Sequence, residues 1–318
     1  MTLSKRGHDE MPDRQRDLHG LNGKAAPKIG PFLRWAGGKR QLRKILLNFL
    51  PEDMGQRTYR EPFLGGGSLF FAIRPKTAIL SDANEHLIRC YKFVRDEPGL
   101  VARYLHSHAA KDGEAYYYRV REEYNRSEFS AAQAARFIYL NKTCFNGIFR
   151  VNAKGKFNVP YGRKESPAIP SENDLIAIAG ILKDTSLKAS SYEKALENAS
   201  KEDFIYLDPP YPPLNGTAYF THYTKDRFSE EDQKTLAERV HELDRCGCML
   251  MISNADTPLI RRLYRKYELV SLPVIRYLTC KSVRHKVKEL VITNYEVNRA
   301  CPTNALVRPK KDNVLPKK

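Results

Sequence analysis

The tetrapeptide Asp208, Pro209, Pro210 and Tyr211 carries the clearest chemistry in the sequence. It directly follows the apolar run 204–207, which predicts a strand with the motif at its carboxyl end, where open α/β sheets bind ligands. A carboxylate and a carbonyl of a proline-stiffened turn can accept the hydrogens of a planar amine and so favour the tetrahedral, nucleophilic nitrogen. The tyrosine ring offers a face on which an extruded base can stack. Asp-Pro-Pro is also ordinary turn chemistry, so the motif alone leaves a structural role open.

A second candidate is the segment 61–68, Glu-Pro-Phe-Leu-Gly-Gly-Gly-Ser. Its three successive glycines precede an apolar helical pattern, and such a turn lets the backbone approach a ligand closely. The segment lacks the lysine of a P-loop and the spacing of the dinucleotide fingerprint. This favours a nucleoside without a bound pyrophosphate over ATP or NAD. The alternative is a flexible turn between a strand and a helix.

Two further segments could complete a nucleoside site. Asp82 closes the apolar run 78–80, where a sheet site keeps the acid that hydrogen-bonds ribose hydroxyls. It could also cap a helix over 84–94, and both roles can hold at once. Trp35, the only tryptophan, lies four residues before Lys39, so an aromatic edge and a cation can meet the sulfonium and carboxylate of one ligand. A lone tryptophan is more often a core residue.

Taken together, four ordered motifs resemble the DNA adenine-N6 methyltransferases of the Dam type: Trp-Ala-Gly-Gly-Lys, Glu-Pro-Phe-Leu-Gly-Gly-Gly, Ser-Asp-Ala-Asn and Asp-Pro-Pro-Tyr. The resemblance implies methyl transfer from S-adenosylmethionine to a flipped-out adenine in double-stranded DNA. It implies an α/β fold, a Rossmann-like methyltransferase sheet with an inserted, mostly helical target-recognition domain. The implied catalytic residues are Asp208, Pro209, Pro210 and Tyr211, and the implied cofactor site comprises Trp35, Lys39, Phe63, Gly65, Gly67, Asp82 and Asp208. Phe220 and Tyr223 are expected to wall the base pocket or to serve as packing aromatics.

The segment 141–150 resembles the DNA-reading hairpin of the same family. The resemblance implies that Phe145 wedges into the base stack, that Asn146 contacts the opposite strand and that Arg150 reads guanine O6 and N7. Ile148 and Pro160 would contact a thymine methyl. Relatives specific for GATC share the Arg, Asn and Pro, whereas Leu is common at the place of Ile148, so GATC is the expected site.

Composition supports a nucleic-acid partner independently. The formal net charge is +17 over 318 residues, and the stretch 136–164 holds seven basic residues and no acidic one, a pattern suited to phosphate contact. A basic surface also suits RNA, an anionic membrane or solubility, and the stretch can be read as a solvated loop. Six scattered cysteines favour a reducing cytoplasm, with association to the nucleoid through DNA. No membrane segment is expected, since no run of about twenty apolar residues occurs. No metal and no obligate protein partner are expected either.

The elements that must position these residues alternate in an α/β pattern. Strands are expected at 78–80, 204–207 and 249–252, helices at 82–94, 229–243 and 258–267, and an antiparallel hairpin from 274–278 and 290–293. Ser229 and Asp232 resemble a capping box, with Asp in place of the preferred Glu or Gln. The region 98–197 is mostly helical with a Gly/Asn-rich interruption at 141–163. We therefore expect a disordered leader at 1–28, a catalytic domain from 29–97 and 198–296, a DNA target-recognition domain at 98–197 and a flexible basic tail at 297–318.

Two other functions stay open on the sequence alone. An amino-methyltransferase acting on cytosine N4 or on RNA adenine would use the same tetrapeptide, because it suits any planar exocyclic amine. A DNA-binding protein that keeps the fold without turnover is the alternative from another class. The intact segments 35–39 and 208–211 argue against the second alternative.

Overall fold

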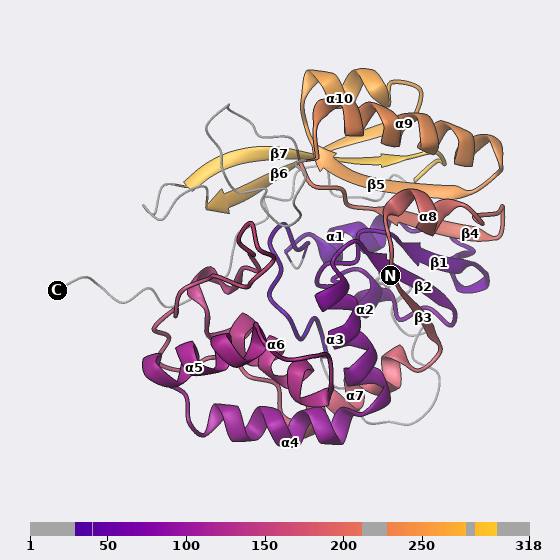
Figure 1. Cartoon of the computed structure of the whole chain (residues 1–318). Coiled ribbons are helices and arrows are strands. Elements are labelled where there is room, and N and C mark those ends of the chain that lie inside the picture. Colours follow the sequence, from indigo (N-terminus) through magenta and orange to yellow (C-terminus); the bar gives the residue numbers. More distant parts are fainter. Residues whose placement is uncertain (1–28, 40, 212–227, 278–283, 298–318) are drawn as a thin grey trace, which may run out of the picture.

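The structure, a computed structural model, describes residues 29–39, 41–211, 228–277 and 284–297 (Figure 1). A seven-stranded sheet with the order β3-β2-β1-β4-β5-β7-β6 runs through it. Strands β1 to β5 are parallel to one another, whereas β7 is antiparallel to both β5 and β6. The strands are β1 (Thr58–Glu61), β2 (Ala78–Asp82), β3 (Thr185–Ala189), β4 (Asp203–Leu207), β5 (Met249–Ala255), β6 (Glu268–Tyr277) and β7 (Arg284–Thr293). This mixed sheet confirms the predicted α/β class.

The order of the strands places a ligand site at the centre of the sheet. From β1 the chain moves outward to β2 and β3, and it then returns to β4 on the other side of β1. The carboxyl ends of β1 and β4 therefore lie at the point where the strand order reverses, which is where open α/β sheets bind ligands. All five residues of β4 are buried, as expected for a parallel strand covered on both faces.

A group of helices lies between β2 and β3 in the chain and packs together on one side of the sheet (Figure 1). Helix α4 lies against both α6 and α7, and α3 lies against α6 and α7. The group comprises α3 (Glu85–Asp96), α4 (Pro98–Ala109), α5 (Glu114–Tyr124), α6 (Ala131–Thr143) and α7 (Glu172–Leu182). Strand β3 follows α7 and pairs with β2 over its whole length, so the last part of the range 98–197 belongs to the sheet.

The remaining helices flank the strands. They are α1 (Arg43–Leu46), α2 (Phe70–Ile73), α8 (Tyr192–Leu196), α9 (Glu230–Arg245) and α10 (Pro258–Leu263), and short 3-10 turns occur at η1 (Leu47–Phe49), η2 (Met54–Gln56) and η3 (Phe145–Gly147). The capping box of α9 is confirmed, because the Ser229 hydroxyl accepts the Asp232 N–H at 3.2 Å and the Asp232 carboxylate accepts the Ser229 N–H at 2.6 Å. Helix α10 ends four residues earlier than expected, since Tyr264 leaves helical geometry with φ −108° and ψ 19°.

The three strands expected from apolar runs are confirmed as β2, β4 and β5. The expected hairpin is confirmed as β6 and β7, although β6 begins at Glu268, six residues before the apolar run. The expected leader at 1–28 and nearly all of the expected tail lie outside the described residues. Within the part of the chain that the structure describes, no helix combines the length and apolar character needed to cross a membrane.

Candidate active site

Asp208 and Lys39 form an ion pair at the carboxyl end of β4. The Lys39 ammonium donates to the two carboxylate oxygens of Asp208 at 2.6 and 2.8 Å and to the Gly37 carbonyl at 3.0 Å. Gly37 has φ +73°, a left-handed conformation that suits glycine. Lys39 is only 5% exposed, so its charge is compensated mainly by these oxygens. The structure therefore brings together two segments that the sequence assigned to one ligand.

Tyr211 completes this group. The Lys39 ammonium lies 4.7 Å from the centroid of the Tyr211 ring, within range of a cation–π interaction. The Tyr211 hydroxyl donates to the Glu289 carboxylate of β7 at 3.1 Å. The turn is also held from α9, because the Gln233 side chain donates to the Pro210 carbonyl at 3.0 Å. The buried Asn254 amide of β5 in turn donates to Gln233 at 2.9 Å, so the tetrapeptide is fixed by three separate elements.

Asp82 links the carboxyl end of β2 to the glycine turn. One carboxylate oxygen accepts the Gly65 N–H and the other accepts the Asn84 N–H, both at 2.9 Å. Desolvation raises the pKa of Asp82 to about 6, against the two backbone N–H groups, which lower it. The helix cap of α3 is Asn84, whose side chain accepts the Leu87 N–H at 3.1 Å. The alternative reading of Asp82 as that cap is therefore wrong.

The glycine turn packs directly against Trp35. Gly65 has φ +48°, and a Cβ atom added there would lie 2.7 Å from Cδ1 of Trp35. Gly67 has φ +62° and is also tightly surrounded, with its nearest neighbours 3.3 Å from an added Cβ. The Trp35 ring stacks on Phe149 with centroids 6.0 Å apart and an interplanar angle of 17°. The half-buried Trp35 thus lies between the glycine turn and the segment that follows α6.

A third part of the site surrounds Phe63. Its ring stacks on Tyr192 at a centroid distance of 5.3 Å and meets Phe228 edge-on at 6.0 Å. Next to this cluster, the Ser190 N–H donates to the Asp82 carbonyl at 3.1 Å. The Ser190 hydroxyl oxygen is buried and has no hydrogen-bond partner among the described residues. The unused hydroxyl therefore belongs to a residue whose backbone is hydrogen-bonded to that of Asp82.

Comparison with known proteins identifies the family. A family model described as D12 class N6 adenine-specific DNA methyltransferase matches residues 35–278, from Trp35 through β4 and into the last strands. The chain belongs to this class. Methyltransferases of the class use S-adenosylmethionine as the methyl donor.

Three relatives of the methyltransferase align along nearly their whole length. Type II methyltransferase M1.LlaDCHI of Lactococcus lactis subsp. cremoris is 38% identical over 274 residues, covering 84% of this chain and 96% of the relative. Type II methyltransferase M.MjaIII of Methanocaldococcus jannaschii is 38% identical over 288 residues, covering 84% of this chain and 100% of the relative. The DNA adenine methylase of Escherichia coli K12 is 37% identical over 264 residues, covering 82% of this chain and 93% of the relative. The resemblance that four motifs indicated is confirmed.

The segment expected to read DNA forms a turn after α6. Asn141 to Thr143 still belong to the helix, and two isolated antiparallel bridges, Cys144 with Tyr161 and Val151 with Phe157, close the turn in place of a regular hairpin. Phe145 directly follows Cys144 at the base of this turn and is 42% exposed, and the neighbouring Asn146 is exposed with φ 55°.

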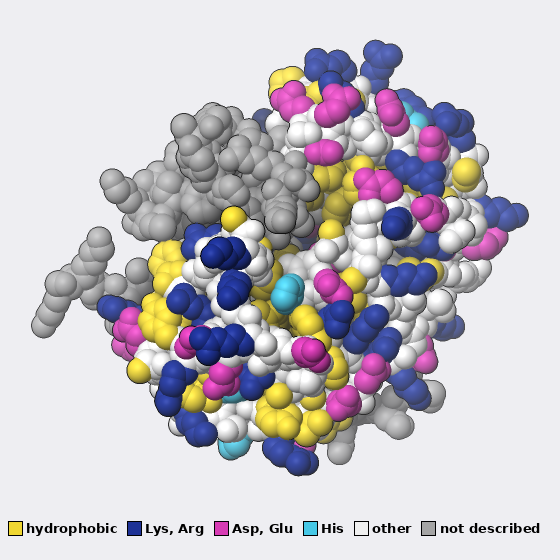
Figure 2. Space-filling model, viewed as in Figure 1, with side chains coloured by type: hydrophobic (Ala, Val, Ile, Leu, Met, Phe, Trp, Pro, Cys, Tyr) yellow, Lys and Arg dark blue, Asp and Glu magenta, His cyan; other side chains and the backbone are white. Residues whose placement is uncertain are grey.

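Arg150 and Pro160 lie on the two arms of this methyltransferase loop. The Arg150 Nε donates to the Asn158 side-chain oxygen at 2.8 Å, and the Pro160 carbonyl accepts the Phe145 N–H at 2.9 Å. Ile148 is half-buried two residues before Arg150. Lys and Arg side chains gather over the loop region above α6 in Figure 2. Phe220 and Tyr223 lie outside the described residues.

Sequence reasoning missed a buried polar layer beneath the site. The Tyr59 hydroxyl donates to Glu61 at 2.9 Å, and the Tyr206 hydroxyl is 2.9 Å from the Ser253 hydroxyl. Burial raises the pKa of Glu61 well above its usual range. Both tyrosines lie in short strands, where the sequence alone suggests an aromatic residue of the apolar core. Only the tertiary structure reveals their polar partners.

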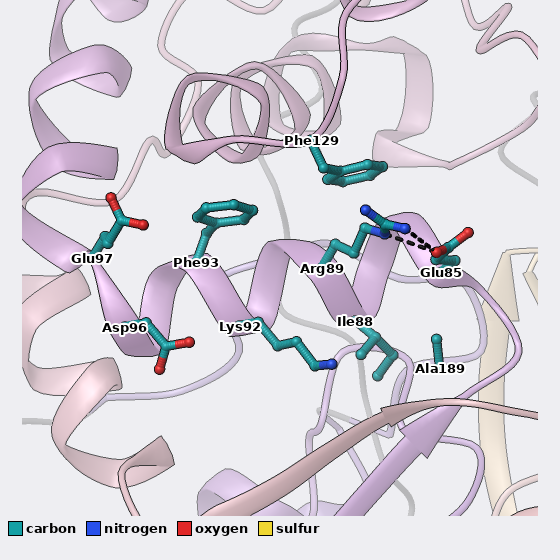
Figure 3. A pocket seen from close by; sticks show the side chains of 9 residues that line it. All are labelled: Glu85, Ile88, Arg89, Lys92, Phe93, Asp96, Glu97, Phe129 and Ala189. Carbon is teal, nitrogen blue, oxygen red and sulfur yellow. Dashed lines mark hydrogen bonds and ion pairs between the residues drawn. The ribbon is translucent and has the colours of Figure 1, made fainter.

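A separate hollow lies along α3 (Figure 3). One cation and one carboxylate of its lining are already paired, because Arg89 is hydrogen-bonded to Glu85 and lies 4.9 Å from the centroid of the Phe129 ring. The lining residues are Glu85, Ile88, Arg89, Lys92, Phe93, Asp96, Glu97, Phe129 and Ala189, and none of them was expected in the site. The candidate active site is therefore the group at the carboxyl ends of β1, β2 and β4.

Proposed function

We propose that this methyltransferase methylates adenine N6 within GATC in duplex DNA, with the target base flipped onto Tyr211 and Asp208 as the acceptor for its amine. The observation that carries the proposal is the convergence of Lys39, Asp208 and Tyr211 at the end of β4. An amine acceptor and a stacking face thus lie within one rigid turn.

The cofactor would lie along the ends of β1 and β2. Asp82 would accept hydrogen bonds from the ribose hydroxyls, and the turn 65–67 would let the backbone approach the cofactor closely. The side chains of Trp35, Phe63 and Lys39 would complete the wall of the cofactor pocket. When bound, S-adenosylmethionine supplies an electrophilic methyl group on a sulfonium sulfur. The residues fit this group, because they supply a carboxylate at Asp82, an unused buried hydroxyl at Ser190 and an aromatic wall at Phe63.

The chain's own residues would act on the amine. Its nitrogen lone pair is delocalised into the purine ring, so acceptors that favour a tetrahedral nitrogen lower the barrier. Asp208 would accept one amine hydrogen and the Pro209 carbonyl the other, since the Pro210 carbonyl already accepts Gln233. The Lys39 ammonium stabilises the negative charge of Asp208. After the nitrogen–methyl bond forms, the extra proton on nitrogen would leave to water.

We infer that residues 29–97 and 198–296 act as the catalytic domain and that 98–197 acts as the target-recognition domain, with β3 built into the sheet. Phe145 would enter the base stack, Asn146 would contact the opposite strand, and Ile148 and Pro160 would contact thymine methyls. The hydrogen bond from Arg150 to Asn158 supports a fixed guanidinium that meets guanine bidentately. The scattered cysteines favour a cytoplasmic enzyme acting at the nucleoid.

The test combines one variant with one sequencing experiment. Asp208→Ala should lower turnover by about 100-fold or more, because an acceptor needed in the transition state is lost. The exposed Asp184→Ala serves as the matched control and should turn over like the wild type. Methylation-sensitive sequencing of DNA from cells that express the protein should find N6-methyladenine at GATC. Methylation centred on another sequence would contradict the assigned site and leave the reaction itself intact.

A further inference from the structure

Strand β7 places a carboxylate inside the sheet, close to the site. Glu289 is 3% exposed and lies opposite Ala255 of β5 and Leu272 of β6. β7 is the inner strand of the hairpin, between β5 and β6 (Figure 1). A buried carboxylate between apolar neighbours costs free energy unless hydrogen bonds compensate it. The position therefore calls for a specific partner.

The partner on the catalytic side is Tyr211. Its hydroxyl donates to Glu289 at 3.1 Å across 78 residues of sequence. A hydroxyl that donates to a carboxylate forms a charge-assisted bond, which is stronger and more directional than a neutral one. The same ring faces the Lys39 ammonium at 4.7 Å. Tyr211 is thus held at its hydroxyl by β7 and at its ring by the residue that also pairs with Asp208.

We propose that Glu289 is a positioning residue for methyl transfer, which anchors the hydroxyl end of the Tyr211 ring so that the flipped adenine stacks in register with Asp208. The inference rests on the proposed role of Tyr211. A tyrosine bonded only through its backbone can turn about its side-chain torsions, and each orientation would place the base differently. A bond at the hydroxyl anchors the far end of the ring before the base arrives, and the Lys39 ammonium over the ring face limits rotation of its plane. Small displacements of a reacting group cost rate steeply.

A double-mutant cycle tests the proposal in single-turnover methylation at saturating DNA and cofactor. Tyr211→Phe keeps the ring and removes only the hydroxyl, and Glu289→Gln keeps the shape and removes the charge. Each should slow the transfer step by about tenfold, with the dissociation constant for DNA changed by less than about twofold. The double variant should be no slower than the slower single variant, because Tyr211→Phe breaks the bond that Glu289→Gln weakens by removing its charge. Glu268→Gln, an exposed carboxylate on neighbouring β6, is the matched control and should match the wild type.

The outcomes separate this inference from the role of Tyr211 itself. Losses that multiply in the double variant, or wild-type rates in either single variant, would overturn the positioning role. If those rates are unchanged while Tyr211→Ala is inactive, the ring stacks without help from Glu289. Wild-type turnover by Tyr211→Ala would instead overturn the proposed function. Tyr211→Phe keeps the test decisive if Glu289→Gln does not fold, because it leaves the buried carboxylate in place.

Discussion

The side chain of Asn141 holds the backbone of Arg34 at both its N–H and its carbonyl group, each at 2.8 Å. The same amide donates to the Gly147 carbonyl at 3.3 Å. A Cβ atom added at Gly147 would lie 2.6 Å from Cδ of Arg34, so the two segments are in close contact. The end of α6 therefore joins the segment before Trp35 to the loop that carries Phe145.

Asn141→Ala should destabilise the protein and weaken DNA binding. The change leaves one N–H and two carbonyl groups without their side-chain partner, and such losses cost about 1–3 kcal/mol of unfolding free energy. Denaturant unfolding and DNA titration measure the two effects. Asn173→Ala, at an exposed asparagine in the first turn of α7, is the control and should change neither. Unchanged DNA affinity in a destabilised Asn141→Ala protein would limit Asn141 to a structural role.

Gly65→Ala should displace Trp35 and weaken cofactor binding. The φ of +48° disfavours alanine by about 1–2 kcal/mol, and the new methyl group would meet the indole ring at 2.7 Å. Because Trp35 is the only tryptophan in the chain, its fluorescence reports the displacement directly. Cofactor titration followed by this signal measures the affinity.

Gly180→Ala is the matched control for this change. Gly180 lies inside α7 with no atom within 4 Å of an added Cβ, so alanine should leave the fluorescence unchanged and stabilise the helix by about 0.5–1 kcal/mol. An unchanged spectrum in Gly65→Ala would mean that the glycine turn can shift without moving Trp35.

Apolar runs in the sequence predicted the apolar strands, but no such run marks β1 or β3. Strand β1 reads Thr-Tyr-Arg-Glu, and its charges are buried because Arg60 pairs with Asp203 at 2.8 Å and Glu61 accepts the Tyr59 hydroxyl. Strand β3 reads Thr-Ser-Leu-Lys-Ala at the edge of the sheet, where three of its five residues are exposed or half-buried. Hydropathy cannot mark a strand whose polar groups find their partners elsewhere in the chain.

The site was predictable to the extent that its residues form local motifs. Asp208, Lys39 and Tyr211 stand in such motifs, and the structure brings them into contact. Asn141 and Glu289 stand in helical and strand patterns that say nothing about their partners. Their roles depend on contacts 107 and 78 residues away, which only the tertiary fold brings about.

The raised pKa of Asp82 predicts that a rise in pH strengthens cofactor binding and lowers the stability of the fold. Its pKa of about 6 lies above the value of 3.8 of an unperturbed group, so the folded protein binds the proton more tightly between these values. The contribution of Asp82 to the unfolding free energy therefore falls as the pH rises through this window. Acceptance of ribose hydroxyls needs the ionised carboxylate, so affinity should rise with pH and fall by up to about tenfold per unit below pH 6.

Asp82→Asn should remove both dependences. Calorimetric titration with a non-reactive cofactor analogue between about pH 5 and 7.5 should give a weak, nearly constant affinity for the variant. Its unfolding free energy relative to the wild type should improve as the pH rises. Asp184→Asn, at an exposed position, is the control for both measurements. A wild-type affinity that does not change across this range would show that Asp82 does not bind the ribose as an ionised group.

Arg150 and Lys154 should differ in the kind of loss that their removal causes. The Arg150 guanidinium is oriented by Asn158 at 2.8 Å, whereas Lys154 is an exposed side chain in the turn between the two arms of the loop. An oriented guanidinium can meet guanine O6 and N7 together, which is worth about 1–3 kcal/mol of discrimination at one base pair. An exposed lysine near phosphates contributes without regard to sequence.

Arg150→Ala should therefore lower kcat/KM on GATC duplexes while leaving the rate on duplexes altered at the guanine nearly unchanged. Lys154→Ala should lower the rates on all duplexes by one common factor and reduce the salt dependence of binding by about one unit of slope. Asn158→Ala should resemble Arg150→Ala in direction with a smaller loss, because the guanidinium stays but is no longer held. Rates on GATC and on duplexes changed at the first or last base decide between these patterns. If Arg150→Ala slows every duplex equally, Arg150 contacts phosphate, and the GATC assignment loses its main support.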